Sequence, residues 1–168
     1  MQGMRYMVMD FLNITPKEQV KTYRLMNTGF SQLDEKSSVQ TSEKTYIGDK
    51  VATSNIKGIK TEFPFSTDIY TDEETVMFVR SIFRNQKTGD ECVTTYVRTD
   101  ISVDGYGVPL QQSGPPHLVP AREFSVSVLV DSETGGGGEM LTLSGKLLQR
   151  GDFVDGMFNL ETGTFVPA

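Results

Sequence analysis

Alternation of side chains with period two is the feature that most restricts how this chain can fold. In residues 92–101, which are rich in β-branched side chains, the odd-numbered and even-numbered positions form two alternating sets. The same alternation occurs in residues 124–130 and 140–148. Successive side chains of an extended strand point to opposite faces of a sheet, so each stretch predicts a β-strand. Residues 59–65 predict a further strand, and we expect Pro64 to place it at a sheet edge or at its own end. A mainly β fold follows.

Turn signals separate these strands. Residues 131–139 combine polar residues with four consecutive glycines, which predicts a hairpin connection because glycine readily adopts positive φ. A phosphate-binding loop is the other interpretation of a glycine run, but a strand pattern follows it rather than a Lys-Ser/Thr pair that opens a helix. Residues 153–158 and 164–166, joined through Thr162-Gly163, predict a closing hairpin.

One amphipathic helix is predicted over residues 71–85. Thr71 and Glu74 have the spacing of a capping box, and neighbouring acidic residues suit the positive end of the helix dipole. Apolar residues then recur at helical spacing on one face. The side chains expected in the core are those on this face: Val76, Val79, Ile82 and Phe83. A second helix is expected over residues 16–26, with Thr15 as its N-cap and a proline in its first turn.

Two stretches lack any periodicity. Residues 33–45 are polar, and residues 102–122 hold four prolines. Loops of this length inside a compact domain are uncommon and are usually functional or disordered. We therefore expect a single domain over residues 1–168, with extended arms at about 31–50 and 102–122 that contact other molecules. The subunit contacts expected in the first arm are Leu33, Lys36, Gln40, Thr41, Lys44 and Tyr46.

Composition argues against several classes of function. The net charge of −6 argues against specific nucleic-acid binding, which depends on clustered Lys and Arg. A single cysteine, Cys92, and a single histidine, His117, exclude an internal disulfide, a thiolate zinc site and a His-rich metal site. No spacing singles out a pair of carboxylates, and no nucleophile can be tied to His117. We predict no catalytic residues, no cofactor, no metal and no enzyme activity.

Membrane and export signals are absent from the sequence pattern. No stretch approaches the roughly 18 apolar residues of a membrane span. The N-terminal stretch is interrupted by Arg5 and Asp10, so it lacks the continuous apolar region of a signal peptide. We expect no membrane partner and a protein made in a reducing cytoplasm.

The faces opposite the predicted core are small and neutral rather than charged. The residues that share this character are Cys92, Thr94, Thr99, Ser125, Ser127, Thr142 and Ser144. Faces of this kind suit contact with another protein or with a water-filled cavity. They favour a structural or assembly role over a lone monomer.

Several short motifs follow one another in a fixed order along residues 25–168. In the N-terminal part they are Thr28-Gly29-Phe30, Gln40-Thr41, Lys44-Thr45-Tyr46-Ile47, Phe63-Pro64-Phe65 and the helix exit at residues 84–89. In the C-terminal part they are Ala121-Arg122, a glycine-rich hairpin before Glu139, Gly151-Asp152, Gly156 and Thr164-Phe165. In this order they resemble the major tail (tail tube) proteins of long-tailed phages and prophages of Gram-positive bacteria.

The resemblance implies a two-sheet antiparallel β-sandwich or partial barrel flanked by one α-helix. It implies hexameric rings stacked into a tube around a tape measure protein, with tail terminator and distal tail proteins as further partners. The expected location is a virion tail assembled in the host bacterial cytoplasm, with DNA passing through the lumen unbound. Tubes of contractile or secretion-type machines stay open as alternatives. The rival class is a monomeric β-sandwich binding module, for instance for carbohydrate, although the chain has no Trp.

An acidic subunit suits such a tube, because a basic lumen would hold the phosphates of passing DNA. We expect the lumen to be neutral to acidic. The acids expected at the lumen or at the junction between rings lie near the predicted hairpin: Asp131, Glu133 and Glu139.

Overall fold

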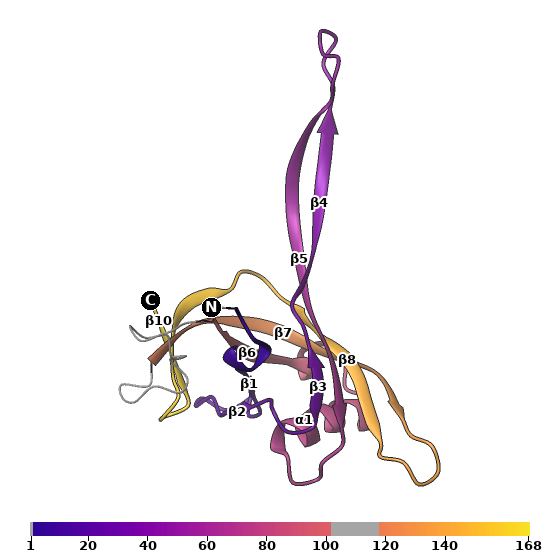
Figure 1. Cartoon of the computed structure of the whole chain (residues 1–168), viewed down its shortest axis with the longest axis vertical. Coiled ribbons are helices and arrows are strands. Elements are labelled where there is room, and N and C mark those ends of the chain that lie inside the picture. The colour runs from indigo at the N-terminus through magenta and orange to yellow at the C-terminus, as the bar shows by residue number, and fades with distance from the viewer. Residues whose placement is uncertain (1, 102–117) are drawn as a thin grey trace.

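A computed structural model describes residues 2–101 and 118–168. It contains one α-helix, two short 3-10 helices and ten strands, shown in Figure 1. In chain order the elements are η1 (Arg5–Met7), β1 (Asp10–Asn13), β2 (Tyr23–Leu25), β3 (Phe30–Leu33), β4 (Lys36–Lys44), β5 (Thr53–Asp68), α1 (Glu74–Arg84), η2 (Gly89–Cys92), β6 (Val93–Thr99), β7 (Leu118–Thr134), β8 (Thr142–Gln149), β9 (Val154–Asn159) and β10 (Thr164–Pro167).

The strands form one continuous antiparallel sheet that curves without closing into a barrel. Its main path runs β2-β1-β6-β7-β8-β5-β3, while β4 extends along β5 and the β9–β10 hairpin joins β7. The two longest strands change partners along their length: β7 pairs with β9 and then with β8, and β5 pairs with β4 and then with β3. The predicted mainly β fold with one helix is confirmed, and its layers belong to a single hydrogen-bonded sheet.

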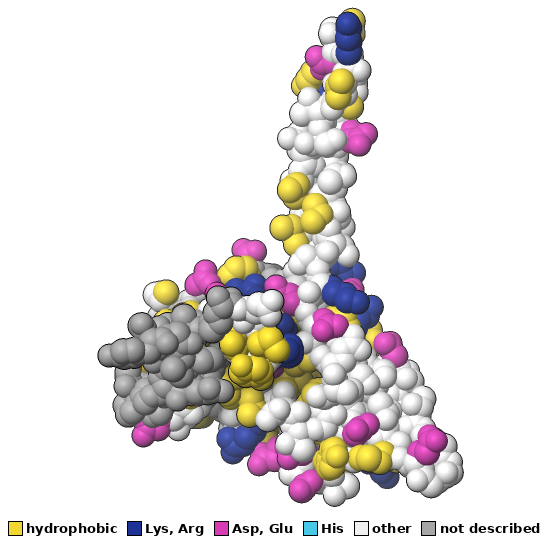
Figure 2. Space-filling model, in the orientation of Figure 1, with side chains coloured by type: hydrophobic (Ala, Val, Ile, Leu, Met, Phe, Trp, Pro, Cys, Tyr) yellow, Lys and Arg dark blue, Asp and Glu magenta, His cyan; other side chains and the backbone are white. Residues whose placement is uncertain are grey.

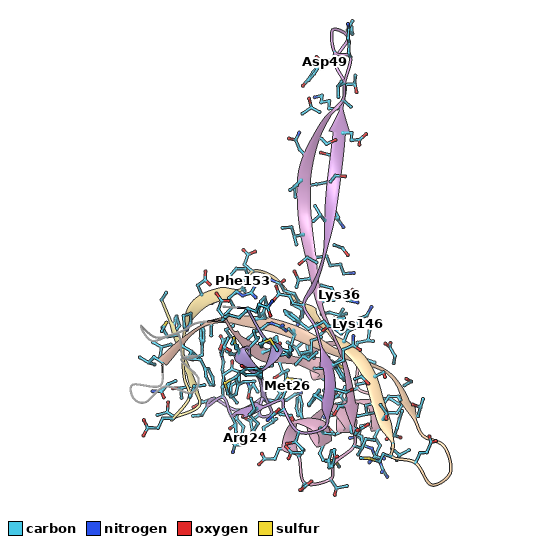
Figure 3. All side chains as sticks on the ribbon, in the orientation of Figure 1. Arg24, Met26, Lys36, Asp49, Lys146 and Phe153 are labelled. Atoms are coloured by element: carbon cyan, nitrogen blue, oxygen red, sulfur yellow. The ribbon has the colours of Figure 1, made fainter. Side chains whose placement is uncertain are left out.

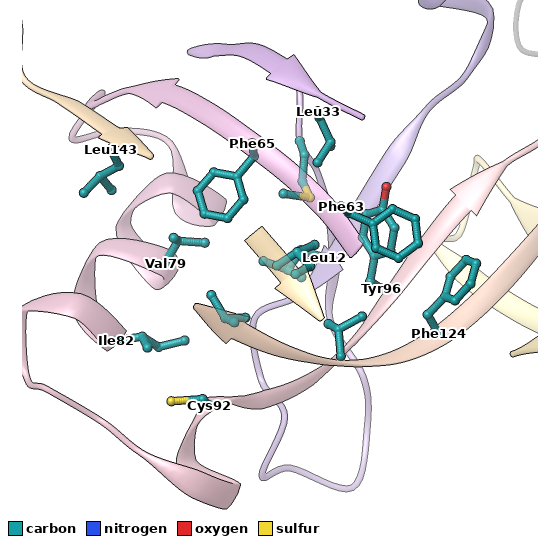
Figure 4. Close-up of a cluster of buried hydrophobic side chains, with 14 residues drawn as sticks. Leu12, Leu33, Phe63, Phe65, Val79, Ile82, Cys92, Tyr96, Phe124 and Leu143 are labelled. Atoms are coloured by element: carbon teal, nitrogen blue, oxygen red, sulfur yellow. The ribbon is translucent and has the colours of Figure 1, made fainter. Parts of the chain in front are cut away.

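Two hydrophobic cores lie on opposite faces of this sheet. Leu12 of β1 and Tyr96 of β6 point into the first core, which is shown in Figure 4. Their chain neighbours Phe11 and Val97 point into the second core, where Phe11 stacks on Phe158 with ring centroids 4.2 Å apart. Period-two alternation thus supplies both cores from the same strands. Each fully buried large apolar side chain contributes about 1.5–3 kcal/mol.

Helix α1 covers the first core but begins later than its sequence suggests. Val76, Val79 and Ile82 are buried, and Phe83 is half-buried against the same core. The predicted capping box is wrong, because the helix begins at Glu74 after Glu73, and no side chain caps it. The acidic residue of its first turn, Glu74, still complements the helix dipole.

The helix predicted over residues 16–26 is also wrong. The side-chain oxygen of Asn13 accepts hydrogen bonds from the backbone amides of Thr15 and Thr22, both at 3.0 Å. The Thr15 hydroxyl, instead of capping a helix, donates to the carbonyl of Val20. These local bonds close a loop that returns the chain to pair with β1, and Tyr23 is then buried in the second core. Side chains of Asn and Thr compete with helix formation in this way.

Pro64 lies inside the sheet rather than at an edge or strand end. Strand β5 is 16 residues long and pairs with β8 on one side and with β3 and β4 on the other. The carbonyl of Pro64 accepts from the amide of Asp34, in the short break between β3 and β4. A strand residue directs its nitrogen and its carbonyl to the same side, so the missing N–H falls at this break, where the ladder is already interrupted.

Candidate functional site: the β4–β5 arm

A two-stranded hairpin projects from the body of the molecule (Figures 1 and 3). We call residues 36–60 the arm: it comprises β4, a tip at residues 45–52 and the first half of β5. Strand β8 pairs with β5 only from Glu62 onward, so the arm has no third strand among the described residues. At about 3.3 Å per residue, the nine residues of β4 extend roughly 30 Å. Residues 33–45, predicted to lack regular structure, therefore mostly form a strand.

The two faces of the arm differ in character. Val39 lies directly opposite Ile59, and Ile56 follows on the same face; their side chains are 52%, 66% and 69% exposed. The opposite face carries polar residues: Ser38, Gln40, Ser42, Asn55 and Lys60. An isolated two-stranded hairpin is only marginally stable in water. A partner that covers the apolar face would remove this surface from water and stabilise the arm.

A β-bulge creates this apolar face. Gln40 pairs with Gly58 while Thr41 pairs with Ile56, so Lys57 is an extra residue in β5. Without the bulge, Ile56 and Ile59, three positions apart, would point to opposite faces. The sequence analysis missed the second strand of the arm because this extra residue interrupts the alternation.

The tip of the arm is an ordered turn with exposed apolar side chains. The amide of Asp49 donates to the carbonyl of Tyr46 at 2.9 Å, and the amide of Tyr46 donates to the Asp49 carboxylate at 3.1 Å. The Lys44 ammonium lies 5.0 Å from the centroid of the Tyr46 ring. Ile47 and Val51 are almost fully exposed. Figure 3 labels Asp49 at this tip and Lys36 at the base.

Charge is distributed unevenly between the arm and the rest of the chain. The arm holds five lysines and two acidic residues, which gives +3. The other residues hold 11 Lys and Arg and 20 Asp and Glu, which gives −9, so the two parts add to the total of −6. The projecting element of an acidic protein is therefore itself basic.

An ionic network fixes the base of the arm to the body. Glu35, between β3 and β4, accepts from Arg122 at 2.5 Å and lies 3.7 Å from Arg98. Arg98 also contacts the buried carboxylate of Asp10, which accepts from Arg5 at 2.6 Å and from the Tyr96 hydroxyl. Burial raises the pKa of Asp10, while Arg98, Tyr96 and Arg5 oppose this shift. Strands β1, β6 and β7 thus jointly hold the arm at its base.

The predicted contact residues divide between arm and core. Those in the arm are exposed: Lys36, Gln40, Thr41, Lys44 and Tyr46. Leu33 instead lies in β3 and is buried in the first core, so it offers no surface to a neighbour. The second predicted arm, residues 102–122, lies outside the described residues up to position 117, and positions 118–122 begin β7.

The three predicted acids lie on or beside the β7–β8 hairpin. Asp131 is exposed at a bulge in β7, and Glu139 is exposed in the connection to β8. Glu133 is half-buried and accepts from Arg80 of α1 at 2.7 Å. This hairpin lies at the end of the body away from the arm (Figure 1).

A broad outer face of the sheet is mostly small and polar, although it also carries Pro64, Leu129 and Leu148. It consists of the half-exposed residues of β5, β8 and β7 that point away from the first core, for example Ser66, Ser144 and Ser127. Its lysine, Lys146, lies 3.5 Å from Glu62 of the neighbouring strand. Cys92, Thr94 and Thr99, which the sequence analysis also placed on outer faces, are instead buried.

No group of three or more metal-ligating side chains gathers within residues 2–101 and 118–168. In the same part of the chain, no helix has both the length and the apolar character needed to cross a membrane.

Comparisons with known proteins give structural likeness without sequence likeness. No protein-family model and no curated protein matches the sequence. The fold is similar to that of a chain in the tail of an empty GTA particle refined with C6 symmetry, with a TM-score of 0.59 and 11% identity over 90% of this chain and 97% of that chain. It is also similar to a chain of the six-fold symmetrised anti-feeding prophage (AFP) baseplate, with a TM-score of 0.50 and 10% identity over 88% of this chain and 89% of that chain. The fold is thus one found in tail-type particles.

Proposed function

We propose that this protein is a structural subunit of a phage tail tube and forms stacked hexameric rings that conduct the genome. The arm carries this proposal: an isolated subunit leaves its apolar face in water, whereas an assembly covers it. The six-fold symmetry of the two particles with a similar fold supports six subunits per ring. The protein is proposed to act without catalysis.

The small polar face of β5, β8 and β7 is proposed as the lumen wall. Six subunits that each contribute these three strands and one neighbouring strand give ~24 strands, and at ~4.7 Å spacing the circumference is roughly 110 Å. With strand tilt, the diameter becomes about 35–50 Å, which is wide enough for duplex DNA. Because Lys146 lies beside Glu62, this face offers phosphates little unbalanced positive charge.

The expected partners follow from this role. We propose that the tube surrounds a tape measure protein and joins tail terminator and distal tail proteins in a virion tail assembled in the host bacterial cytoplasm. A long-tailed phage or prophage of Gram-positive bacteria is the proposed source of the tail type. A tube of a contractile or secretion-type machine is the alternative, and the similarity to a chain of the AFP baseplate favours keeping it.

Solution size tests the proposal directly. We expect sedimentation analysis of the concentrated protein to reveal rings of about 112 kDa, six copies of 18.7 kDa, and negative-stain electron microscopy to reveal stacked tubes. A variant in which Asn-Gly replaces residues 39–59 is expected to keep both cores and to remain monomeric, since the arm lies outside both. A wild-type protein that stays monomeric at every concentration would instead favour the carbohydrate-binding or other β-sandwich module.

A further inference from the structure

A cavity of about 610 Å³ lies where the base of the arm meets the body. Ser37 and Lys60 of the arm, Arg122 of β7, and Asp152 and Phe153 of the connection between β8 and β9 all contribute to its lining. Figure 3 labels Phe153 beside the base of the arm. Cavities that bind small molecules measure about 300–1,000 Å³, so this one has room for a small ligand.

The connection between β8 and β9 has a fixed shape. The amide of Arg150 donates to the carbonyl of Ser125 at 2.7 Å, and the side-chain amide of Gln149 donates to the carbonyl of Gly151 at 2.9 Å. Gly151 has a φ of 72°, a conformation that suits glycine. The turn therefore presents the two residues that follow it in a set position, and a site formed in advance loses less entropy on binding.

One wall of the cavity is aromatic. The Arg122 guanidinium lies 5.1 Å from the ring centroid of Phe124 and 5.4 Å from that of Phe153, and the two rings are 5.5 Å apart. Glu35 accepts from Arg122 at 2.5 Å, which holds the guanidinium in place. Phe124 is buried, whereas Phe153 is 41% exposed and offers apolar surface to a ligand.

The polar part of the lining carries no net charge. Its charged side chains are two acids and two bases: Glu35, Asp152, Lys60 and Arg122. Figure 2 shows dark blue and magenta side chains together where the arm joins the body. Asp152 and Lys60 are exposed and have no ion-pair partner within the described part of the chain. The hydroxyl oxygens of Ser37 and Thr61, 3.2 Å apart, add groups that both donate and accept.

We propose that this cavity binds a neutral sugar. A pyranose ring has an apolar face of C–H groups, which packs on the exposed part of the Phe153 ring. Its hydroxyl groups both donate and accept, so they bond to the carboxylate of Asp152 and to the ammonium of Lys60. A charged ligand gains little from a lining whose acids and bases balance. The inference concerns a binding activity of the subunit and does not depend on the proposed tube.

The free subunit is the form in which the cavity is accessible. Ile59 lines the cavity and also belongs to the apolar face of the arm, which the proposed assembly covers. Binding is therefore measured on the dilute full chain, at concentrations where sedimentation shows single subunits.

Saturation-transfer NMR with three neutral disaccharides tests the inference. The probes are cellobiose, maltose and N,N′-diacetylchitobiose. We expect transfer to the C–H protons of at least one of them, and binding of that probe at least tenfold weaker in Phe153→Leu and in Asp152→Asn. Tyr70→Leu and Asp131→Asn are the matched controls, because each makes the same kind of change at an exposed residue outside the cavity. Their binding should equal that of wild type.

Methyl NMR of the wild-type chain gives a second result that needs no cavity variant. With isoleucine methyl groups labelled, the probe should shift the signal of Ile59, which lines the cavity, and leave that of Ile47 at the arm tip unchanged. This measurement decides the question even if a cavity variant fails to fold.

The other outcomes count against the inference. No saturation transfer to any of the three disaccharides would overturn it, as would unchanged binding in both cavity variants. Equal losses in the control variants, or a shift at Ile47 without one at Ile59, would place the sugar elsewhere and also overturn it. Sedimentation of the concentrated protein tests the tube separately, so failure of either proposal leaves the other standing.

Discussion

At the scale of single residues, Gln86 is the one non-glycine residue with positive φ within residues 2–101 and 118–168, at 51°. It ends α1: the amide of Lys87 donates to the carbonyl of Ile82 at 3.1 Å, in the manner of a Schellman motif. Glycine is the usual residue at this position because a side chain strains the left-handed conformation. Gly89 lies three residues after Gln86, so it cannot provide the left-handed residue that ends α1.

Gln86→Gly should therefore stabilise the fold. We expect about 0.5–1 kcal/mol, because relief of left-handed strain outweighs the greater freedom of glycine in the unfolded chain. For a chain of this size the melting temperature should rise by about 1–4 °C. Asn85→Gly is the matched control: Asn85 has a φ of −89°, so glycine there relieves nothing and should destabilise slightly. Equal shifts in calorimetry for both variants would contradict this account.

Neighbouring core residues of α1 should differ in their cost of truncation. Helical periodicity places Ile82 and Phe83 on one face, but Ile82 is buried whereas Phe83 is half-buried. Ile82→Ala should cost about 2–5 kcal/mol. Phe83→Ala should cost less than the roughly 3–5 kcal/mol of a fully buried phenylalanine, since water already reaches part of the ring. Urea unfolding of both variants measures the difference, and a Phe83→Ala cost above 5 kcal/mol would refute the assigned burial.

At the scale of elements, Gly145 marks the closest approach between two strands. A Cβ built at this position of β8 would lie 2.2 Å from the carbonyl oxygen of Leu129 in β7, next to the bulge between Val130 and Ser132. Backbone atoms at this distance cannot move aside without breaking the ladder. The glycine is thus required by the bulge.

Gly145→Ala should accordingly destabilise the β7–β8 pair by about 1–3 kcal/mol or more. Gly58 offers the matched control in β5, because a Cβ there meets only the end of the Gln40 side chain at 3.9 Å. Gly58→Ala should leave the stability of the body within about 0.5 kcal/mol of wild type. The measurement is the denaturant midpoint, and similar losses for the two variants would exclude the close approach as the cause.

The sequence predicts an element well when the residues that determine it lie within that element, and poorly when they lie elsewhere in the chain. The strands with strict alternation, β6, β7 and β8, and the apolar face of α1 follow from periodicity alone. The arm does not, because the extra Lys57 breaks the alternation in β5 and the polar residues of β4 pair only with β5. The false helix at residues 16–26 fails for a different reason: Asn13, outside the segment, captures its backbone amides.

At the scale of the whole molecule, the candidate site was predicted as an extended polar contact arm at about residues 31–50, but not as a two-stranded hairpin. Its basic charge can be counted from the sequence, but its apolar face and its projection from the body depend on the pairing of residues such as Val39 and Ile59, 20 positions apart, and on the path of the whole sheet. The proposed tube function, by contrast, would place demands on the entire ring. A lumen must let phosphates pass, so its charge is a property of the assembly rather than of any single residue.

The outer face of β5, β8 and β7 therefore carries a last prediction about tube function. Ser144→Lys adds one positive charge per subunit on this face, and in the proposed hexameric rings it would form a ring of six positive charges in every layer. Such tubes should retain short duplex DNA, and retention should fall steeply as salt rises, because bound phosphates release counterions. Ser54→Lys, on the exposed arm, adds the same charge outside the proposed lumen and should not retain DNA inside the tube. Filter-binding with assembled tubes at several salt concentrations distinguishes the two. Tight, salt-sensitive retention by wild-type tubes would show that the wall is basic after all, and equal retention by both variants would place this face outside the lumen.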